Sequence, residues 1–120
     1  MKNFFVTGDR FELFNKDELV AESRFSIEEP DDLFNSVYVG LFKLETTKEF
    51  RRKGYASLLL IEIFDYVKNE LGIDNILLNV YKDNYGALNL YFNNGFKIYR
   101  EYDDYFTLLK HLYSFSFSLN

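Results

Sequence analysis

A basic stretch that ends in a glycine turn is the part of this chain best suited to hold an anion. Positions 51–53 are Arg, Arg and Lys, Gly54 follows, and a mostly apolar segment begins at Tyr55. The first backbone N–H groups of a helix lack partners within the helix and carry partial positive charge. A glycine lets the backbone approach a phosphate closely, and basic side chains add charge beside it. The stretch therefore predicts a phosphate cradle at the start of a helix.

The segments around this cradle supply the order strand, loop, helix that such a site requires. Residues 41–46 predict a strand, and residues 57–71 predict an amphipathic helix that Gly72 ends. Residues 76–81 are almost continuously apolar, as in a strand covered on both faces, and should pair in parallel with strand 37–46. The cradle then lies at the carboxyl end of the first strand, where open α/β sheets bind ligands.

A second motif begins at Asn84. Asn84 predicts a helix N-cap, and Gly95 predicts a left-handed stop before a strand that begins at Phe96. Residues three and four apart share a helix face, so Asn84, Ala87 and Tyr91 should lie on one side. A polar cap, a small residue and a phenol would then line one surface.

Together the two motifs resemble those of the GCN5-related N-acetyltransferase (GNAT) family. The Arg-x-x-Gly-x-Ala spacing of residues 51–56 is similar to the family's pantetheine-pyrophosphate loop. The Asn, small residue, Leu-Tyr and Gly-Phe of residues 84–96 are similar to its second motif. The resemblance covers about residues 37–110 and implies transfer of an acetyl group from acetyl-CoA, as co-substrate, to a primary amine. Direct attack in a ternary complex is expected, with backbone polarisation of the thioester carbonyl.

The fold that the resemblance implies is α/β (α+β), with a mixed, strongly bent central sheet of about six to seven strands and helices on both faces. The chain has 120 residues, of which 48% are hydrophobic and 20% aromatic, which suits one domain with a substantial core. We expect a strand meander over 1–36, an acetyl-CoA-binding core over 37–110, and a C-terminal strand or tail over 111–120.

The resemblance also assigns roles to individual residues. Main-chain groups of residues 44–46 would pair with the pantetheine arm as if it were a strand. Backbone amides of residues 52–57 would hold the pyrophosphate, and Asn84 would bind near the thioester. The implied cofactor-binding residues are Leu44, Glu45, Thr46, Arg51, Arg52, Lys53, Gly54, Tyr55, Ala56, Ser57, Asn84, Ala87 and Tyr91.

Two residues are candidates for the chemistry itself. By analogy with the family, Tyr91 would give a proton to the departing thiolate; the alternative is that it is one of ten tyrosines packed in an aromatic core. Glu45 is a candidate general base if strand alternation turns it toward the acceptor. A water chain that ends at a carboxylate or at Tyr81 would serve as well, and Glu45 could be a solvated or structural carboxylate.

Composition excludes several kinds of site. The chain has no cysteine and a single histidine, His111, which argues against thiol nucleophiles, disulfides and a catalytic metal cluster. It also has no Gly-x-Ser-x-Gly elbow. We therefore expect metal-free chemistry without a covalent cysteinyl intermediate.

Charge and hydropathy bear on partners. A net charge of −5 argues against nucleic-acid binding. The apolar run at residues 4–6 is too short for a signal peptide, and we see no membrane span, so a cytoplasmic protein that does not bind a membrane is expected. Acidic residues gather at 28–32 and at 101–104. They are either ordinary solvated loops or, for 101–104, the border of a site for a cationic amine.

The two ends of the chain leave alternatives open. Residues 4–6, 10–14 and 19–27 predict a meander with no helix between its strands, which departs from the family. An open cleft would suit a protein amine as acceptor, or a partner chain could complete the site. Residues 111–120 alternate large apolar residues with serine. They could pair in a homodimer or fold back on their own domain.

Other functions remain compatible with this sequence. A catalytically silent acyl-CoA-binding or inhibitory module could keep the fold and the coenzyme pocket. A purely structural interaction domain would need no cradle and would not be stabilised by coenzyme A.

Overall fold

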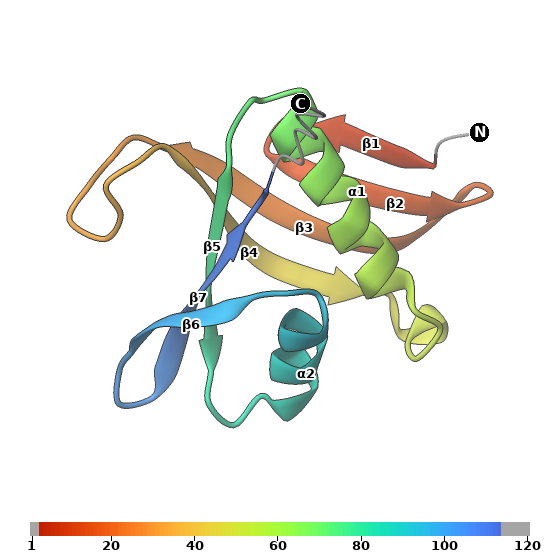
Figure 1. Cartoon of the computed structure of the whole chain (residues 1–120). Helices are drawn as coiled ribbons and strands as arrows, with labels where there is room; N and C mark the ends of the chain where they lie inside the picture. Colours follow the sequence, from red (N-terminus) through yellow and green to blue (C-terminus); the bar gives the residue numbers. More distant parts are fainter. Residues whose placement is uncertain (1–2, 114–120) are drawn as a thin grey trace, which may run out of the picture.

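The computed structural model describes residues 3–113 as a twisted seven-stranded sheet with two α-helices (Figure 1). In chain order the elements are β1 (Phe4–Thr7), β2 (Arg10–Asn15), β3 (Glu18–Glu28), β4 (Tyr38–Thr46), a 3-10 turn η1 (Lys48–Phe50), α1 (Tyr55–Asn69), β5 (Asn75–Tyr81), α2 (Tyr85–Asn93), β6 (Lys97–Glu101) and β7 (Tyr105–His111).

The sheet is mixed, with the strand order β1-β2-β3-β4-β5-β7-β6. Neighbouring strands are antiparallel except β4 and β5, which are parallel and connected through α1. The predicted three-strand meander, the parallel pair and the final two-strand hairpin are all confirmed. Only Gly8 and Asp9 separate β1 from β2, and from residue 3 to the end of β4 the chain forms no helix, as expected for this region.

Helix α1 begins two residues earlier than expected, because Gly54 takes a left-handed conformation (φ 81°) and forms its N-cap. The buried positions Leu59, Leu60, Ile63 and Val67 recur at helical spacing, as the pattern predicted. The helix ends at Asn69, and Gly72 (φ 66°) lies in the turn that follows it.

The core lies on one face of the sheet. Strand alternation and register place Leu41 of β4, Leu78 of β5 and Leu108 of β7 on a common face. These residues belong to the same buried cluster as Ile63 of α1 and Tyr91 of α2. The expected mixed sheet with helices packed on it is confirmed, and within the described residues α1 and α2 both contribute to this one cluster.

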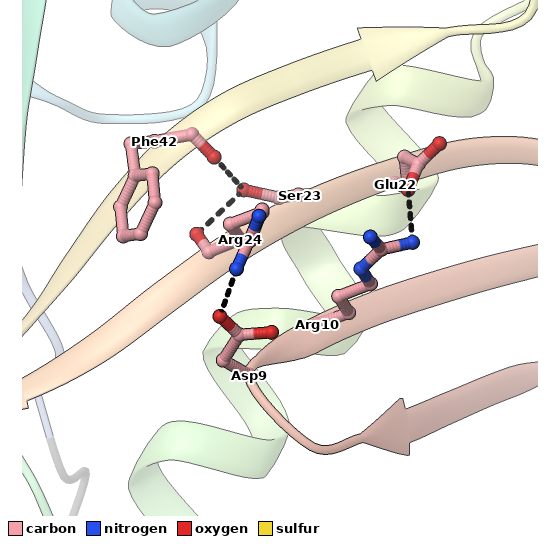
Figure 2. A network of polar contacts seen from close by, with 6 residues as sticks. All are labelled: Asp9, Arg10, Glu22, Ser23, Arg24 and Phe42. Carbon is pink, nitrogen blue, oxygen red and sulfur yellow. Dashed lines mark hydrogen bonds and ion pairs between the residues drawn. The ribbon is translucent and has the colours of Figure 1, made fainter.

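The opposite face of the first strands is polar (Figure 2). Arg10 of β2 pairs with Glu22 of β3 at 3.8 Å, and Arg24 of β3 pairs with Asp9. The Arg24 guanidinium also lies 5.9 Å from the centre of the Phe42 ring. Charged side chains suit this face because it faces water instead of a helix.

Strand β7 ends at His111, whose Nδ1 lies 2.8 Å from Oδ1 of Asn75 on β5. The predicted pairing of the C-terminal tail concerns residues 111–120, of which 114–120 are outside the described residues. Neither helix in residues 3–113 has the length and apolarity to cross a bilayer. Within the same residues, no group of three or more His, Cys, Asp or Glu side chains is placed to hold a metal ion.

Candidate functional site

The parallel strands β4 and β5 separate partway along their length. They pair in register only from Val39 with Ile76 to Leu41 with Leu78, after which β4 continues to Thr46 and β5 to Tyr81 (Figure 1). The main-chain groups of β4 beyond Leu41 therefore have no strand partner on the β5 side. Such an edge can hydrogen-bond an extended ligand arm.

A bulge reorients β4 at the start of this separation. Lys43 has φ 53°, and the register to β3 shifts between Glu22 and Arg24. The buried Ser23 lies at this shift, where its hydroxyl donates to the carbonyl oxygen of Phe42 at 3.2 Å. As a result Phe42 and Glu45 pair with Arg24 and Glu22, on the polar face away from α1. Glu45 is exposed there.

The loop before α1 has the backbone geometry of an anion site. Arg52 (φ 63°) and Gly54 (φ 81°) are both left-handed, which helps successive N–H groups to converge. No side chain caps α1, and the N–H of Leu58 is the first to bond the Gly54 carbonyl, at 3.1 Å. The preceding N–H groups of Tyr55, Ala56 and Ser57 thus have no partner within the helix.

The basic side chains of this loop differ in their contacts. Arg51 donates from Nε to the Thr46 carbonyl at 3.2 Å and so ties the loop to the end of β4. The Lys53 amine lies 5.8 Å from the centre of the Phe50 ring. The guanidinium of Arg51 therefore helps to hold the loop in place.

Helix α2 supplies the other wall. The Asn84 side chain accepts a hydrogen bond from the N–H of Ala87 at 3.2 Å, which confirms the predicted N-cap. Gly95 has φ 89°, which confirms the predicted left-handed stop. Asn94 donates from Nδ2 to the hydroxyl of Ser57 at 3.2 Å and so joins the end of α2 to the first turn of α1.

These elements enclose a cleft of about 790 Å³, called here the cofactor cleft. It brings together all the predicted cofactor-binding residues except Lys53. It is lined by Leu44, Glu45, Thr46, Phe50, Arg51, Arg52, Gly54, Tyr55, Ala56, Ser57, Asn84, Gly86, Ala87, Leu90 and Tyr91. Phe50, Gly86 and Leu90 line the cleft but were not among the predicted residues. Leu90 lies three residues beyond Ala87 and could have been found from helical spacing.

Tyr91 belongs both to the core and to the cofactor cleft. It is 8% exposed, and its ring packs edge-on against Phe96 with centres 5.4 Å apart. Burial raises the pKa of the Tyr91 phenol to about 12. The phenol is therefore neutral at physiological pH and can donate a hydrogen bond into the cleft.

One carboxylate in each acidic cluster is engaged in local structure. Asp31 accepts hydrogen bonds from the N–H groups of Leu33 and Phe34, both at 2.9 Å, and from the Tyr38 hydroxyl at 2.7 Å. These hydrogen bonds, the Tyr38 one foremost, lower the pKa of Asp31. In the second cluster, Glu101 pairs with Lys82 at 2.7 Å.

Comparison with known proteins agrees with this geometry. The family model described as acetyltransferase (GNAT) family matches residues 4–96. No curated protein matches the chain.

Three solved structures illustrate the shared fold. The PaiA N-acetyltransferase of Thermoplasma acidophilum, in complex with coenzyme A, has 22% identity and a TM-score of 0.71, over 85% of this chain and 59% of that one. The N-acetyltransferase PseH of Campylobacter jejuni, in complex with acetyl coenzyme A, has 21% identity and a TM-score of 0.67. The match covers 89% of this chain and 71% of PseH. The ribosomal-protein-S18-alanine N-acetyltransferase of Escherichia coli has 17% identity and a TM-score of 0.71. The match covers 100% of this chain and 76% of the Escherichia coli protein. The chain thus spans less than two thirds of the first of these proteins.

Proposed function

The chain belongs to the acetyltransferase (GNAT) family, and we propose that it transfers the acetyl group of acetyl-CoA to a primary amine. The observation that carries this proposal is the cofactor cleft, in which both sequence motifs meet beside the unpaired edge of β4. Two proteins of similar fold were solved with coenzyme A or acetyl-CoA, which supports the same co-substrate here.

The cofactor would bind through backbone groups along most of its length. The N–H groups from Arg52 to Ser57 would hold the pyrophosphate, where the start of α1 adds positive potential. The pantetheine arm would lie along β4 beyond Leu41, and its amides would bond the main-chain groups that β5 leaves unpaired. Its thioester would then reach the point where β4 and β5 separate.

The chemistry would be a direct attack. The nitrogen of the amine forms a bond to the thioester carbonyl carbon, the carbon–sulfur bond breaks, and the amine loses a proton. With a pKa of about 12, the Tyr91 phenol is a weaker acid than an ordinary thiol, whose pKa is about 8.5. Tyr91 would therefore stabilise the departing thiolate as a hydrogen-bond donor, without full transfer of its proton.

Two exposed groups are candidates to accept the proton that the amine loses. Glu45 lies on the face of β4 away from α1, in an exposed position. It would act through water, as would Tyr81, which is 66% exposed at the end of β5. A Glu45→Gln variant tests the carboxylate, because loss of the base lowers kcat without changing the affinity for acetyl-CoA.

The acceptor would be a cationic small molecule or a protein amine. Asp103 and Asp104 are exposed at the turn between β6 and β7 and would attract positive charge. For a cationic small molecule, the KM should rise with ionic strength because salt screens this attraction. The cytoplasmic location and the homodimer stay predictions.

The experiment that tests the function follows labelled acetyl transfer from acetyl-CoA to a panel of amines and peptides. Acetylated product that depends on this protein supports the proposal. Binding of acetyl-CoA without turnover on any acceptor would favour the silent module. The absence of both binding and turnover would favour a structural domain.

A further inference from the structure

We propose that the acceptor is the N-terminal α-amine of a polypeptide, and that Asn79, held in place by Thr107, recognises the first peptide carbonyl of that chain. This inference rests on the acetyl transfer proposed above and names its substrate class. It concerns a second pocket, which the sequence argument did not identify.

Asn79 lies at the point where the two parallel strands separate. It follows Leu78, the last residue of β5 that pairs with β4. Leu78 and Val80 point into the core on the face covered by the helices, so strand alternation places the side chains of Asn79 and Tyr81 on the opposite face. Asn79 therefore approaches the reacting centre from the side opposite the cofactor cleft.

A pocket of about 230 Å³ opens at this position, lined by Asn79, Val80, Tyr81 and Tyr105, and is called here the Asn79 pocket. The ring of Tyr102 stacks on that of Tyr105 with centres 4.6 Å apart and extends the aromatic wall. No Asp, Glu, Lys, Arg or His among the described residues lines the pocket. Its walls thus suit an uncharged group with a planar or apolar body.

One hydrogen bond fixes the direction of the Asn79 amide. Thr107, which is 2% exposed on β7 directly opposite Asn79, donates from its hydroxyl to Oδ1 of Asn79 at 2.7 Å. With its oxygen occupied in this way, the amide presents its N–H donors to a ligand. A donor beside the reacting amine matches the carbonyl of an N-terminal residue, whereas a polyamine or a lysine side chain has no oxygen at that distance from its nitrogen.

The absence of a carboxylate from the lining points to the same class of acceptor. An α-amine has a pKa of about 7.7–8.0, against about 10.4 for a lysine side chain. Near pH 7.5, roughly a third of an α-amine is neutral but only about one lysine amine in a thousand. An α-amine can therefore attack without a strong base beside it.

The surface beyond the pocket leaves room for the rest of a polypeptide. Because Gly8 and Asp9 alone connect β1 to β2, no helix within residues 3–113 covers the sheet face that carries the ion pairs of Arg10 and Arg24 (Figure 2). A chain that leaves the Asn79 pocket can cross this polar face. In the reaction its neutral terminal nitrogen bonds to the thioester carbonyl carbon, the carbon–sulfur bond breaks to release the thiolate of coenzyme A, and water takes the proton that the nitrogen loses.

The test compares four acceptors at several pH values: a tetrapeptide with a free N-terminus, Nα-acetyl-lysine methylamide, propylamine and spermidine. Near pH 7.5 we expect kcat/KM for the peptide to exceed that for the lysine derivative by about a hundredfold, and this ratio should narrow toward pH 10. A preference for spermidine or for the lysine derivative would overturn the inference and leave the acetyl transfer intact. Acetyl-CoA binding without acetylation of any amine would overturn both.

Asn79→Asp tests the recognition itself, because it replaces the donor by an acceptor of the same shape. The ratio of kcat/KM for the peptide to that for propylamine should fall about tenfold or more, the cost of one lost hydrogen bond. Thr107→Val removes the hydrogen bond that orients the Asn79 amide, so it should also lower the ratio of kcat/KM for the peptide to that for propylamine. The control is Asn75→Asp, since Asn75 is the corresponding residue on the same face of β5, where it contacts His111. An unchanged ratio in Asn79→Asp would contradict the role given to this residue.

Discussion

Leu41 of β4 and Leu78 of β5 are the last residues at which the two parallel strands pair, and the proposed chemistry is located where they separate. On the face that the helices cover, the start of α1 and one side of α2 line the cofactor cleft. On the other face, the Asn79 pocket begins one residue beyond Leu78. The donor and the acceptor could therefore approach one point from opposite sides of the sheet.

The backbone at Gly54 gives a first prediction. A Cβ at Gly54 would meet no atom within 4 Å, but Gly54 lines the cofactor cleft, and φ 81° strains any other residue. We expect Gly54→Ala to destabilise the fold by about 1–2 kcal/mol and to weaken coenzyme A binding about tenfold. Calorimetry and thermal unfolding measure the two effects.

Gly8→Ala is the matched control for this variant. Gly8 also has a left-handed backbone (φ 62°) and open space around it, but it lies in the turn between β1 and β2. It should show the loss of stability with unchanged affinity for coenzyme A. Equal affinities in the two variants would contradict the placement of the pyrophosphate.

Replacement of Arg52 by glycine should stabilise the fold and weaken the binding of coenzyme A. Its φ of 63° is unfavourable for a residue with a side chain, and this strain lies where the cofactor is proposed to bind. Arg52→Gly should raise the free energy of unfolding by up to about 1 kcal/mol and weaken coenzyme A binding, because strain and a positive charge are both removed. Lys16→Gly (φ 57°), in the turn between β2 and β3, should gain stability without loss of affinity. An Arg52→Gly protein that binds as tightly as the wild type would refute a role for this residue.

Tyr91→Phe removes the proposed hydrogen bond to the departing thiolate. We expect kcat to fall about 10- to 100-fold with little change in the affinity for acetyl-CoA, because the bond strengthens as charge develops on sulfur. Because the pKa of Tyr91 is raised to about 12, the wild-type kcat should show no titration of this group at physiological pH. Tyr85→Phe, at an exposed position of α2, is the control and should leave kcat unchanged. A Tyr91→Phe enzyme with wild-type kcat would leave Tyr91 as a core residue only.

Asp31 should make the stability of the folded protein depend on pH in the acidic range. Its pKa is lowered in the folded state by the hydrogen bonds from Tyr38, Phe34 and Leu33. The stabilisation is therefore complete above the ordinary carboxyl pKa of 3.8 and is lost as the pH falls through the lowered value. Asp31→Asn should be less stable than the wild type at neutral pH, and the difference should shrink in acid. Thermal unfolding across this range checks the prediction, and a difference that is independent of pH would contradict it.

The elements could be predicted from the sequence because local patterns determine them. Helical spacing gave α1, the glycines at positions 54 and 95 gave the ends of helices, and Asn84 gave a cap. The positions of the motifs on these elements placed nearly all the cofactor residues in one cleft. Lys53 was the exception, because its own side-chain contact with Phe50 is a matter of packing that spacing does not predict.

The features that could not be predicted from the sequence depend on contacts between segments that are far apart in the chain. The face on which α2 packs follows from the burial of Tyr91 in one cluster with Leu78 of β5 and Leu108 of β7, and the position of β7 between β5 and β6 follows from sheet topology. The bulge at Lys43, which decides the face of Glu45, depends on the register with β3. Asn79 and Thr107 are separated by 28 positions in the chain and meet only because β5 pairs with β7.

The account depends most on the binding of a coenzyme A pyrophosphate at the start of α1. Calorimetry with acetyl-CoA and with pantetheine, which lacks the nucleotide and the pyrophosphate, tests this directly on folded protein. We predict saturable binding of acetyl-CoA, at least about tenfold weaker binding of pantetheine, and loss of that difference in Gly54→Ala. No measurable binding of acetyl-CoA, or equal affinity for the two ligands, would contradict the account.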